Sequence, residues 1–257
     1  MRPFITALAL GLAVASPTLA QEASEDWDLT TNTDQQLTLA TLDFGENVLA
    51  LRCRAGALDL LLTGVPVPTG ETRRVRVSAG AIAAEDQIWT TQPGQPVVGA
   101  SEPDRLARQL RAGGELDLRL EPEDAADRPR RSRLTAPTST RAVNAVLTAC
   151  GQPLDEPRDL IARVPAGAGP LWKTQIVPEF PPQAEAADIE SGVVRLGCIV
   201  GANWKLTDCR PVVETPPGYG FGASATRAAN GAEMSPPADG TDSRGRLLHF
   251  TVRFAMP

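Results

Sequence analysis

Four cysteine residues constrain the fold of this chain more than any other feature, namely Cys53, Cys150, Cys198 and Cys209. Their number is even and no two of them have the C-x-x-C spacing, so two disulfides could form in any of three connectivities. In an exported protein such cysteines form disulfides, whereas in a reducing compartment they would stay as small buried hydrophobic side chains. The N-terminus indicates which of these compartments applies.

Residues 1–20 have the pattern of a secretory signal. Arg2 precedes an apolar run over residues 4–15, and the small residues Thr18 and Ala20 form the small-x-small pattern that signal peptidase accepts. The run is shorter than the roughly 20 residues that a membrane-spanning helix needs. We therefore expect cleavage after Ala20, localisation to the periplasm and no stable membrane insertion afterwards. A retained N-terminal anchor is the alternative.

The charge balance argues against binding to nucleic acid. The chain carries 25 Lys and Arg against 31 Asp and Glu, a net charge of −6. An acidic chain has no general attraction for nucleic acid or anionic lipid. Two arginine clusters are predicted to be solvated surface, at Arg73, Arg74 and Arg76 and at Arg128, Arg130, Arg131 and Arg133.

Residues 27–154 are predicted to form an exported β-rich domain with one or two helices. Short apolar or alternating segments indicate strands at residues 37–39, 48–54, 57–62, 74–78 and 115–121. A charged loop is predicted over residues 122–133. A first helix is expected to start at Ser101 as its capping residue and to end at Gly113-Gly114.

A second helix in this region has the clearest periodicity of the chain. Val143, Val146, Leu147 and Cys150 are spaced so that they lie on one helical face. That face is predicted to pack against the core, where Cys53 lies on an apolar strand. We therefore predict a Cys53–Cys150 disulfide.

The remaining residues are predicted to form a linker over residues 155–174 and a second domain over residues 175–257. In the second domain, residues 192–200 and 206–214 indicate a β-hairpin in which Cys198 and Cys209 lie directly opposite each other. Side chains opposite each other on paired strands are close enough for a disulfide. This register would place Val200 opposite Thr207.

The order of motifs in residues 175–257 resembles the TonB C-terminal domain. The motifs are P-x-F-P-x-x-A, a short helix, a G-V-V strand, a turn, an L-T-D strand, an S-A-T-R-A-A helix, M-x-P and an alternating terminal strand. The resemblance implies an α+β fold, with a three-stranded antiparallel sheet and helices on one face. The expected fold class is therefore α+β, with this small unit following the β-rich domain.

The resemblance also implies a function. TonB-type energy transducers bind outer-membrane transporters by strand addition at a sheet edge. This chain departs from them, because its N-terminal helix is short and lacks a histidine and a cysteine-bearing region replaces the long proline-rich spacer. We therefore expect an envelope protein, such as an outer-membrane transporter, as partner, without energy transduction. The expected contact residues are Trp204, Phe250, Val252, Arg253 and Phe254.

No catalytic constellation is evident, and no enzyme activity, cofactor or metal site is predicted. His249 is the only histidine and is predicted to lie on the exposed face of the terminal strand, without a nucleophile nearby. Trp89, Trp172 and Trp204 are candidate binding platforms. Glu121, Glu123 and Asp124 lie in a polar loop and are predicted to be solvated. A carboxylate-based enzyme in the first domain stays open as an alternative, as does a membrane-anchored energy transducer.

Overall fold

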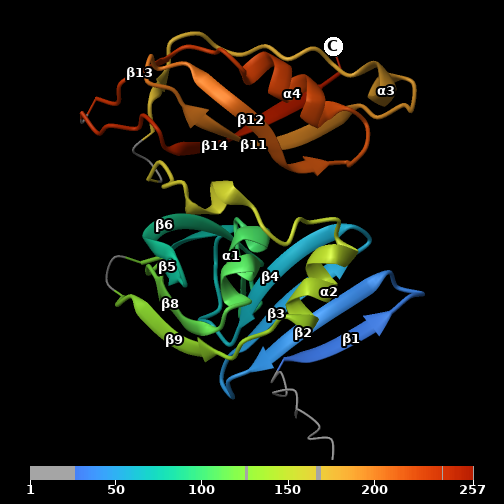
Figure 1. Cartoon of the computed structure of the whole chain (residues 1–257), viewed down its shortest axis with the longest axis vertical. Coiled ribbons are helices and arrows are strands. Elements are labelled where there is room, and N and C mark those ends of the chain that lie inside the picture. Colours follow the sequence, from blue (N-terminus) through green and yellow to red (C-terminus); the bar gives the residue numbers. More distant parts are fainter. Residues whose placement is uncertain (1–26, 125–126, 166–168, 239, 257) are drawn as a thin grey trace, which may run out of the picture.

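The computed structural model describes residues 27–124, 127–165, 169–238 and 240–256 (Figure 1). The predicted signal at residues 1–20 lies outside them. None of the helices in these ranges is long and apolar enough to span a membrane.

The N-terminal part of the chain forms one nine-stranded sheet in which all neighbours are antiparallel. The strand order is β1-β2-β3-β4-β7-β6-β5-β8-β9. The strands are β1 (Asp28–Asn32), β2 (Leu37–Asp43), β3 (Val48–Arg54), β4 (Ala57–Thr63), β5 (Thr72–Ala79), β6 (Ile82–Thr91), β7 (Val97–Gly99), β8 (Gly114–Leu120) and β9 (Arg130–Ala136).

Alternating apolar residues give this sheet one buried face. Leu116, Leu118 and Leu120 of β8 are fully buried, and so is Val75 of β5. Because side chains alternate between the faces of a strand, the residues between them face outward. Helix α1 (Pro103–Leu110) packs against β4 and β5, and helix α2 (Arg141–Ala149) packs against β2 and β3 (Figure 1).

The predicted charged loop at residues 122–133 is in part wrong, because β9 begins at Arg130. Arg131 and Arg133 lie on the outward face of β9, opposite Arg119 and Asp117 of β8. Only Leu134 and Ala136 of β9 are buried. A strand with so few buried side chains shows little hydrophobic alternation, and the sequence pattern therefore missed it.

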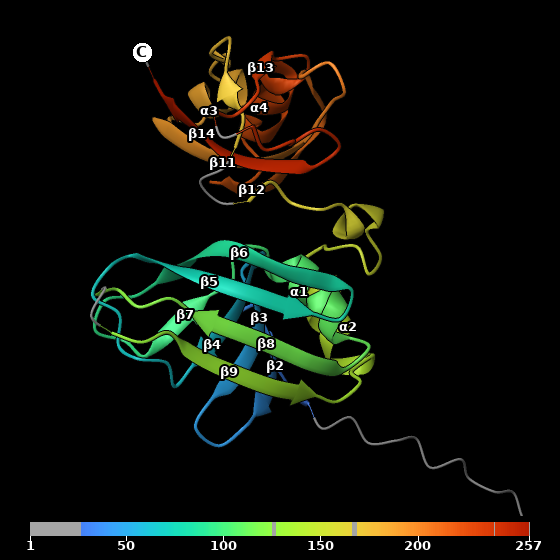
Figure 2. The ribbon, with the colours of Figure 1, turned by 90° about the vertical axis from the view of Figure 1, so that its left-hand side faces the viewer.

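The C-terminal part forms two smaller sheets and a second, separate core. Its elements are β10 (Leu171–Trp172), α3 (Pro182–Glu185), β11 (Ser191–Val200), β12 (Leu206–Thr215), α4 (Phe221–Ala229), β13 (Met234–Ser235) and β14 (Leu247–Ala255). The three-stranded sheet has the order β12-β11-β14, and β10 pairs with β13. Helix α4 packs against β11 and β12. Figure 2 shows this part above β6 of the large sheet.

The expected α+β fold class is wrong. The chain is mostly β, with 43% strand and 15% helix, and its main element is the nine-stranded antiparallel sheet rather than a small C-terminal unit of three strands with helices. The physical reason is that four strands that the sequence pattern did not predict, β1, β6, β7 and β9, increase the strand content. Strands β1 and β7 are short, β9 is mostly polar, and β6 buries only two of its ten residues, so neighbouring strands rather than a hydrophobic pattern of their own hold these strands in place.

Both predicted disulfides are confirmed. Cys53 is bonded to Cys150 and Cys198 to Cys209, with Cα–Cα distances of 5.5 and 4.1 Å. The predicted hairpin register is wrong by one residue, since Val200 pairs with Leu206 and Ile199 with Thr207. A bulge between Gly197 and Ile199, with Asp208 at a φ of 46°, accounts for the shift.

The two disulfides should stabilise the fold to different degrees. Cys53–Cys150 spans 97 residues and Cys198–Cys209 spans 11. In the entropic model, replacing both cysteines of a pair by alanine should lower the free energy of unfolding by about 5 kcal/mol for the long loop and about 3 kcal/mol for the short one. Urea unfolding of the two double variants measures this difference. A larger loss for the hairpin pair would contradict it.

Candidate functional site

The N-terminal and C-terminal cores share no residue, and the contact between them is polar. The first core lies within the large sheet and its two helices, and the second lies between α4 and the three-stranded sheet. Charged side chains from both parts meet between these cores around Glu102. The relation between the two parts of the chain therefore depends on electrostatics more than on apolar packing.

Glu102 directly precedes α1 and lies at its N-cap position, but its side chain makes no capping hydrogen bond. Ser101, the predicted cap, instead donates its hydroxyl to Oε1 of Gln87 on β6 at 3.0 Å. Pro103 occupies the first turn, where a missing N–H costs nothing. The Glu102 carboxylate is therefore directed away from the helix, and it is buried, with 6% of the side chain exposed.

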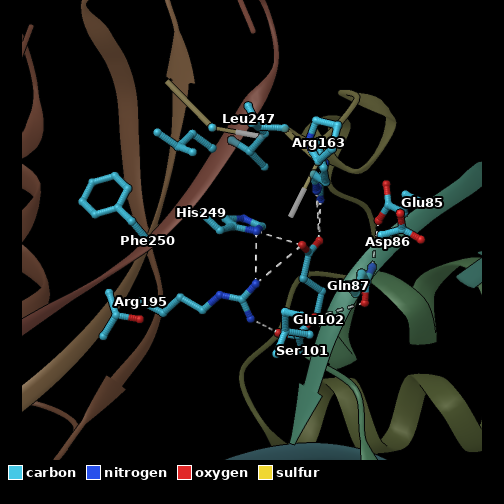
Figure 3. A pocket seen from close by; sticks show the side chains of 16 residues that line it. Glu85, Asp86, Gln87, Ser101, Glu102, Arg163, Arg195, Leu247, His249 and Phe250 are labelled. Atoms are coloured by element: carbon cyan, nitrogen blue, oxygen red, sulfur yellow. Dashed lines mark hydrogen bonds and ion pairs between the residues drawn. The ribbon is translucent and has the colours of Figure 1, made fainter. Parts of the chain in front are cut away.

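Four cationic or ionisable side chains surround this carboxylate, and we call the five residues the Glu102 cluster. Figure 3 shows Glu102 with Arg163, Arg195 and His249. Arg163 donates two hydrogen bonds to Oε2, at 3.0 and 2.8 Å. Nδ1 of His249 lies 2.8 Å from Oε1. Arg195 lies 3.8 Å from Oε1 and Arg105 lies 3.5 Å from Oε2.

The geometry fixes the tautomer of His249. An ionised carboxylate only accepts hydrogen bonds, so Nδ1 carries the proton that it donates to Glu102. The terminal nitrogen of Arg195 that lies 3.2 Å from Nδ1 is therefore a close neighbour, not a donor to it. Arg195 donates instead to the carbonyl of Ser101. The imidazole packs on Gly197, where a Cβ atom would lie 2.9 Å from Nε2.

The cluster shifts the pKa of both partners downward. Burial alone would raise the pKa of Glu102, but the hydrogen bond from His249 and the charge of Arg163 outweigh it and hold that pKa well below its usual range. Burial lowers the pKa of His249 despite the opposing effect of Glu102, and the charges of Arg195 and Arg163 act in the same direction as burial. Near neutral pH the carboxylate is thus ionised and the imidazole is neutral.

This arrangement suits a structural role better than proton transfer. A carboxylate with a strongly lowered pKa is a weak base, and its two oxygens already accept hydrogen bonds from Arg163 and His249. The same contacts connect the start of α1 to β11 and β14, because Arg195 lies on β11 and His249 on β14. We therefore interpret the Glu102 cluster as the contact that holds the C-terminal sheet against the N-terminal part.

Residues 157–164 of the segment predicted to be a linker lie along this contact. They include the 3-10 helix η1 (Pro157–Leu160), in which Asp159 is buried and accepts hydrogen bonds from Arg108 at 2.6 and 2.8 Å. Arg158 donates to the carbonyl of Gly197 at 2.8 Å. Leu247 exchanges backbone hydrogen bonds with the segment, to the carbonyl of Ala162 and from the N–H of Val164, both at 2.9 Å.

A cleft of about 500 Å³ adjoins the Glu102 cluster, and we call it the interdomain cleft (Figure 3). Residues 85–88 of β6 line one wall and residues 247–251 of β14 line the other. Its volume lies within the range usual for ligand sites. Among the described residues, no group of three or more His, Cys, Asp and Glu side chains is placed to hold a metal ion.

A second cavity, of about 610 Å³, continues along β14, and we call it the Trp172 groove. It is lined by Trp172, Lys173, Ile176 and residues 250–253, among others. The Trp172 ring meets Phe250 edge-on, with centroids 5.0 Å apart. Trp172 is 41% exposed, so this groove offers apolar surface to a partner.

The predicted contact residues are distributed unevenly. Phe250, Val252 and Arg253 line the Trp172 groove, and Val252 and Phe254 are buried against the second core. Trp204 is half-buried against the same core, with the guanidinium of Arg244 5.7 Å from its ring centre.

The other predicted platforms and carboxylates lie elsewhere. Trp89 is fully buried in the first core, so it is no binding platform. Glu123 accepts hydrogen bonds from the N–H and hydroxyl of Thr69, and Glu121 pairs with Arg119.

The prediction that His249 lies on an exposed face is wrong. Its side chain does leave β14 on the side away from the second core, but the N-terminal part covers it and only 13% is exposed. Nothing in the local sequence of β14 indicates this cover, since Glu102 and Arg163 come from distant segments. A single histidine flanked by apolar alternation was the only available signal.

Comparison with known proteins gives no match to a family model, a curated protein or a solved structure. The resemblance to the TonB C-terminal domain accordingly stays a prediction.

Replacing the Glu102 carboxylate should destabilise the contact between the two parts. Glu102→Gln keeps the shape but leaves Arg163 and Arg195 without their buried counter-charge, which should lower the free energy of unfolding by about 3 kcal/mol. Asp59→Asn is a matched control, because its pair with Arg52 is 38% and 35% exposed and is worth about 1 kcal/mol or less. Urea unfolding measures both, and equal losses would contradict the role of the cluster.

His249 should make stability depend on pH. Its folded pKa lies below the ordinary 6.5, so as the pH falls through 6.5 the unfolded chain takes up a proton that the folded chain does not. Stability should therefore decrease as the pH is lowered from about 7 to about 5.5, before carboxylates titrate. Because His249 is the only histidine, His249→Asn should remove most of this slope. Urea midpoints across this range test it, and an unchanged slope in the variant would contradict it.

Proposed function

We propose that this protein is an exported, periplasmic binding protein of the cell envelope that binds an extended segment of a partner protein by strand addition at β14. The observation that carries the proposal is the unpaired edge of β14. Two disulfides support an oxidising compartment, and the predicted signal supports export.

The direction of the backbone groups of β14 follows from its neighbours. The carbonyl of Arg246 accepts from Val200, and the N–H of Met256 donates to Glu190, so even-numbered residues face β11. Leu247 directs its groups to Ala162 and Val164 on the other side. Because orientation alternates along a strand, Thr251 and Arg253 also direct their N–H and C=O groups away from β11.

No backbone hydrogen bond joins this side of Thr251 or Arg253 to another part of the described chain. Unpaired N–H and C=O groups in a row are a template for another strand. The pairing of Leu247 with Ala162 and Val164 supports the proposal further, because it is the same kind of main-chain contact at the start of the edge.

The surroundings indicate the chemistry of the partner segment. The Trp172 groove beside the edge offers Trp172, Ile176 and Phe250 to apolar side chains. The charged residues lining it are Arg253 and Lys173, whose ammonium group also lies 2.8 Å from a carboxylate oxygen of Glu233, although the chain as a whole has a net charge of −6. A segment that alternates apolar and acidic residues complements this groove, and main-chain hydrogen bonds would supply the rest of the affinity.

Selection of random displayed peptides on the full chain tests the proposal. Enriched peptides should combine apolar and acidic residues, and hydrogen exchange should show new protection of the Thr251 and Arg253 amides. Thr251→Pro removes the outward N–H without touching the pairing with β11, so it should weaken binding about fivefold to tenfold. Thr251→Ala keeps that N–H and is the matched control.

Two outcomes would contradict strand addition at β14. One is that no peptide is enriched. The other is that enriched peptides bind the proline and alanine variants equally and leave both amides unprotected.

A further inference from the structure

A second unpaired strand edge lies across the interdomain cleft, on β6. The N–H of Thr91 donates to the carbonyl of Glu71, so odd-numbered residues in this stretch of β6 face β5. Asp86 and Ile88 therefore direct their backbone groups to the opposite side. Strand β7 pairs with β6 only at Thr90 and Thr91, which leaves that side of Asp86 and Ile88 without a backbone partner among the described residues.

The two unpaired edges form opposite walls of one cavity. Residues 85–88 of β6 and residues 247–251 of β14 both line the interdomain cleft. Figure 3 shows β6 on one side of Glu102 and the strands bearing Arg195 and His249 on the other. The Glu102 cluster connects the two walls, because His249 lies on β14 and Arg105 forms an ion pair with Glu85 of β6.

The size of the cleft fits a short length of extended chain. One residue of a packed strand occupies about 160 Å³, from its rise, the spacing between strands and the spacing between sheets. A cavity of about 500 Å³ therefore takes about three such residues. The residues with outward backbone groups span a similar length of chain. Asp86 and Ile88 are two residues apart on β6, and His249 and Thr251 are two residues apart on β14.

We propose that the interdomain cleft clamps the partner segment between two strand edges, so that its backbone bonds to β14 on one side and to β6 on the other. This inference rests on the proposed function and adds the N-terminal part to the binding site. The occupant is an extended segment of the partner that runs from the cleft into the Trp172 groove. An apolar residue of it packs between Ile88, which is 41% exposed, and Phe250.

The clamp assigns a role to two features of β6 that would have none if the segment bound at β14 alone. Ile88 is a large apolar side chain exposed on β6, where the outward backbone groups also lack a partner among the described residues. A segment paired on both sides has its N–H and C=O groups satisfied alternately by the two walls, as in the interior of a sheet. Such a segment is bound more tightly than one added to a single edge, because more of its main-chain groups are bonded.

Amide hydrogen exchange of the full chain, with and without a selected peptide, tests the clamp. The expected result is new protection at Asp86 and Ile88 together with Thr251 and Arg253. Ile88→Pro removes an outward N–H at an edge position and should weaken peptide binding about fivefold, whereas Ile88→Val keeps the N–H and should change it less than twofold. The exchange result in the unmodified chain does not depend on how the proline variant folds.

The outcomes separate this inference from the proposed function. Protection of Thr251 and Arg253 with unchanged exchange at Asp86 and Ile88 would overturn the clamp and leave strand addition at β14 in place. Unchanged exchange at all four amides on peptide binding would overturn both. Equal affinity of the Ile88→Pro and Ile88→Val variants, with Asp86 unprotected, would also overturn the clamp.

Discussion

The buried carboxylate of Glu102 is the interaction on which the arrangement of the two parts depends. A buried charge is costly unless it is paired and fully hydrogen-bonded, and here Arg163 and His249 satisfy both oxygens. These partners come from the connecting segment and from β14, so satisfying one charge fixes two distant elements. The two hydrophobic cores share no residue, so no continuous apolar core joins the two parts among the described residues.

The sequence predicts those elements whose own side chains carry the pattern. Leu116, Leu118 and Leu120 alternate and form β8, and the periodic face of α2 leads to Cys150 and its disulfide with Cys53. Strand β9 escapes prediction because its outward residues are arginines and its buried ones are few. The hairpin register shifts because of a bulge at Asp208, and a backbone irregularity of this kind leaves no hydrophobic signature.

The candidate site is harder to predict for a different reason. His249 has an ordinary position in an alternating strand, and its burial results from packing against the N-terminal part of the chain. Glu102 looks in sequence like the first turn of a capped helix, and its real role requires Arg163 and Arg195 to be near. Local periodicity reports which face of an element is apolar, and it holds no information on which polar face another domain will cover.

Strand β14 combines three roles because a strand has two faces and two edges. Val252 and Phe254 pack into the second core, His249 on the opposite face joins the Glu102 cluster, and one edge pairs with β11. The remaining edge would be a liability in solution, since unpaired strand edges favour aggregation. Here part of that edge faces β6 across the interdomain cleft, and Arg253 places a charge farther along it. The Glu102 cluster thus has a second consequence, because it keeps β6 and β14 on opposite sides of the interdomain cleft, as the proposed clamp requires.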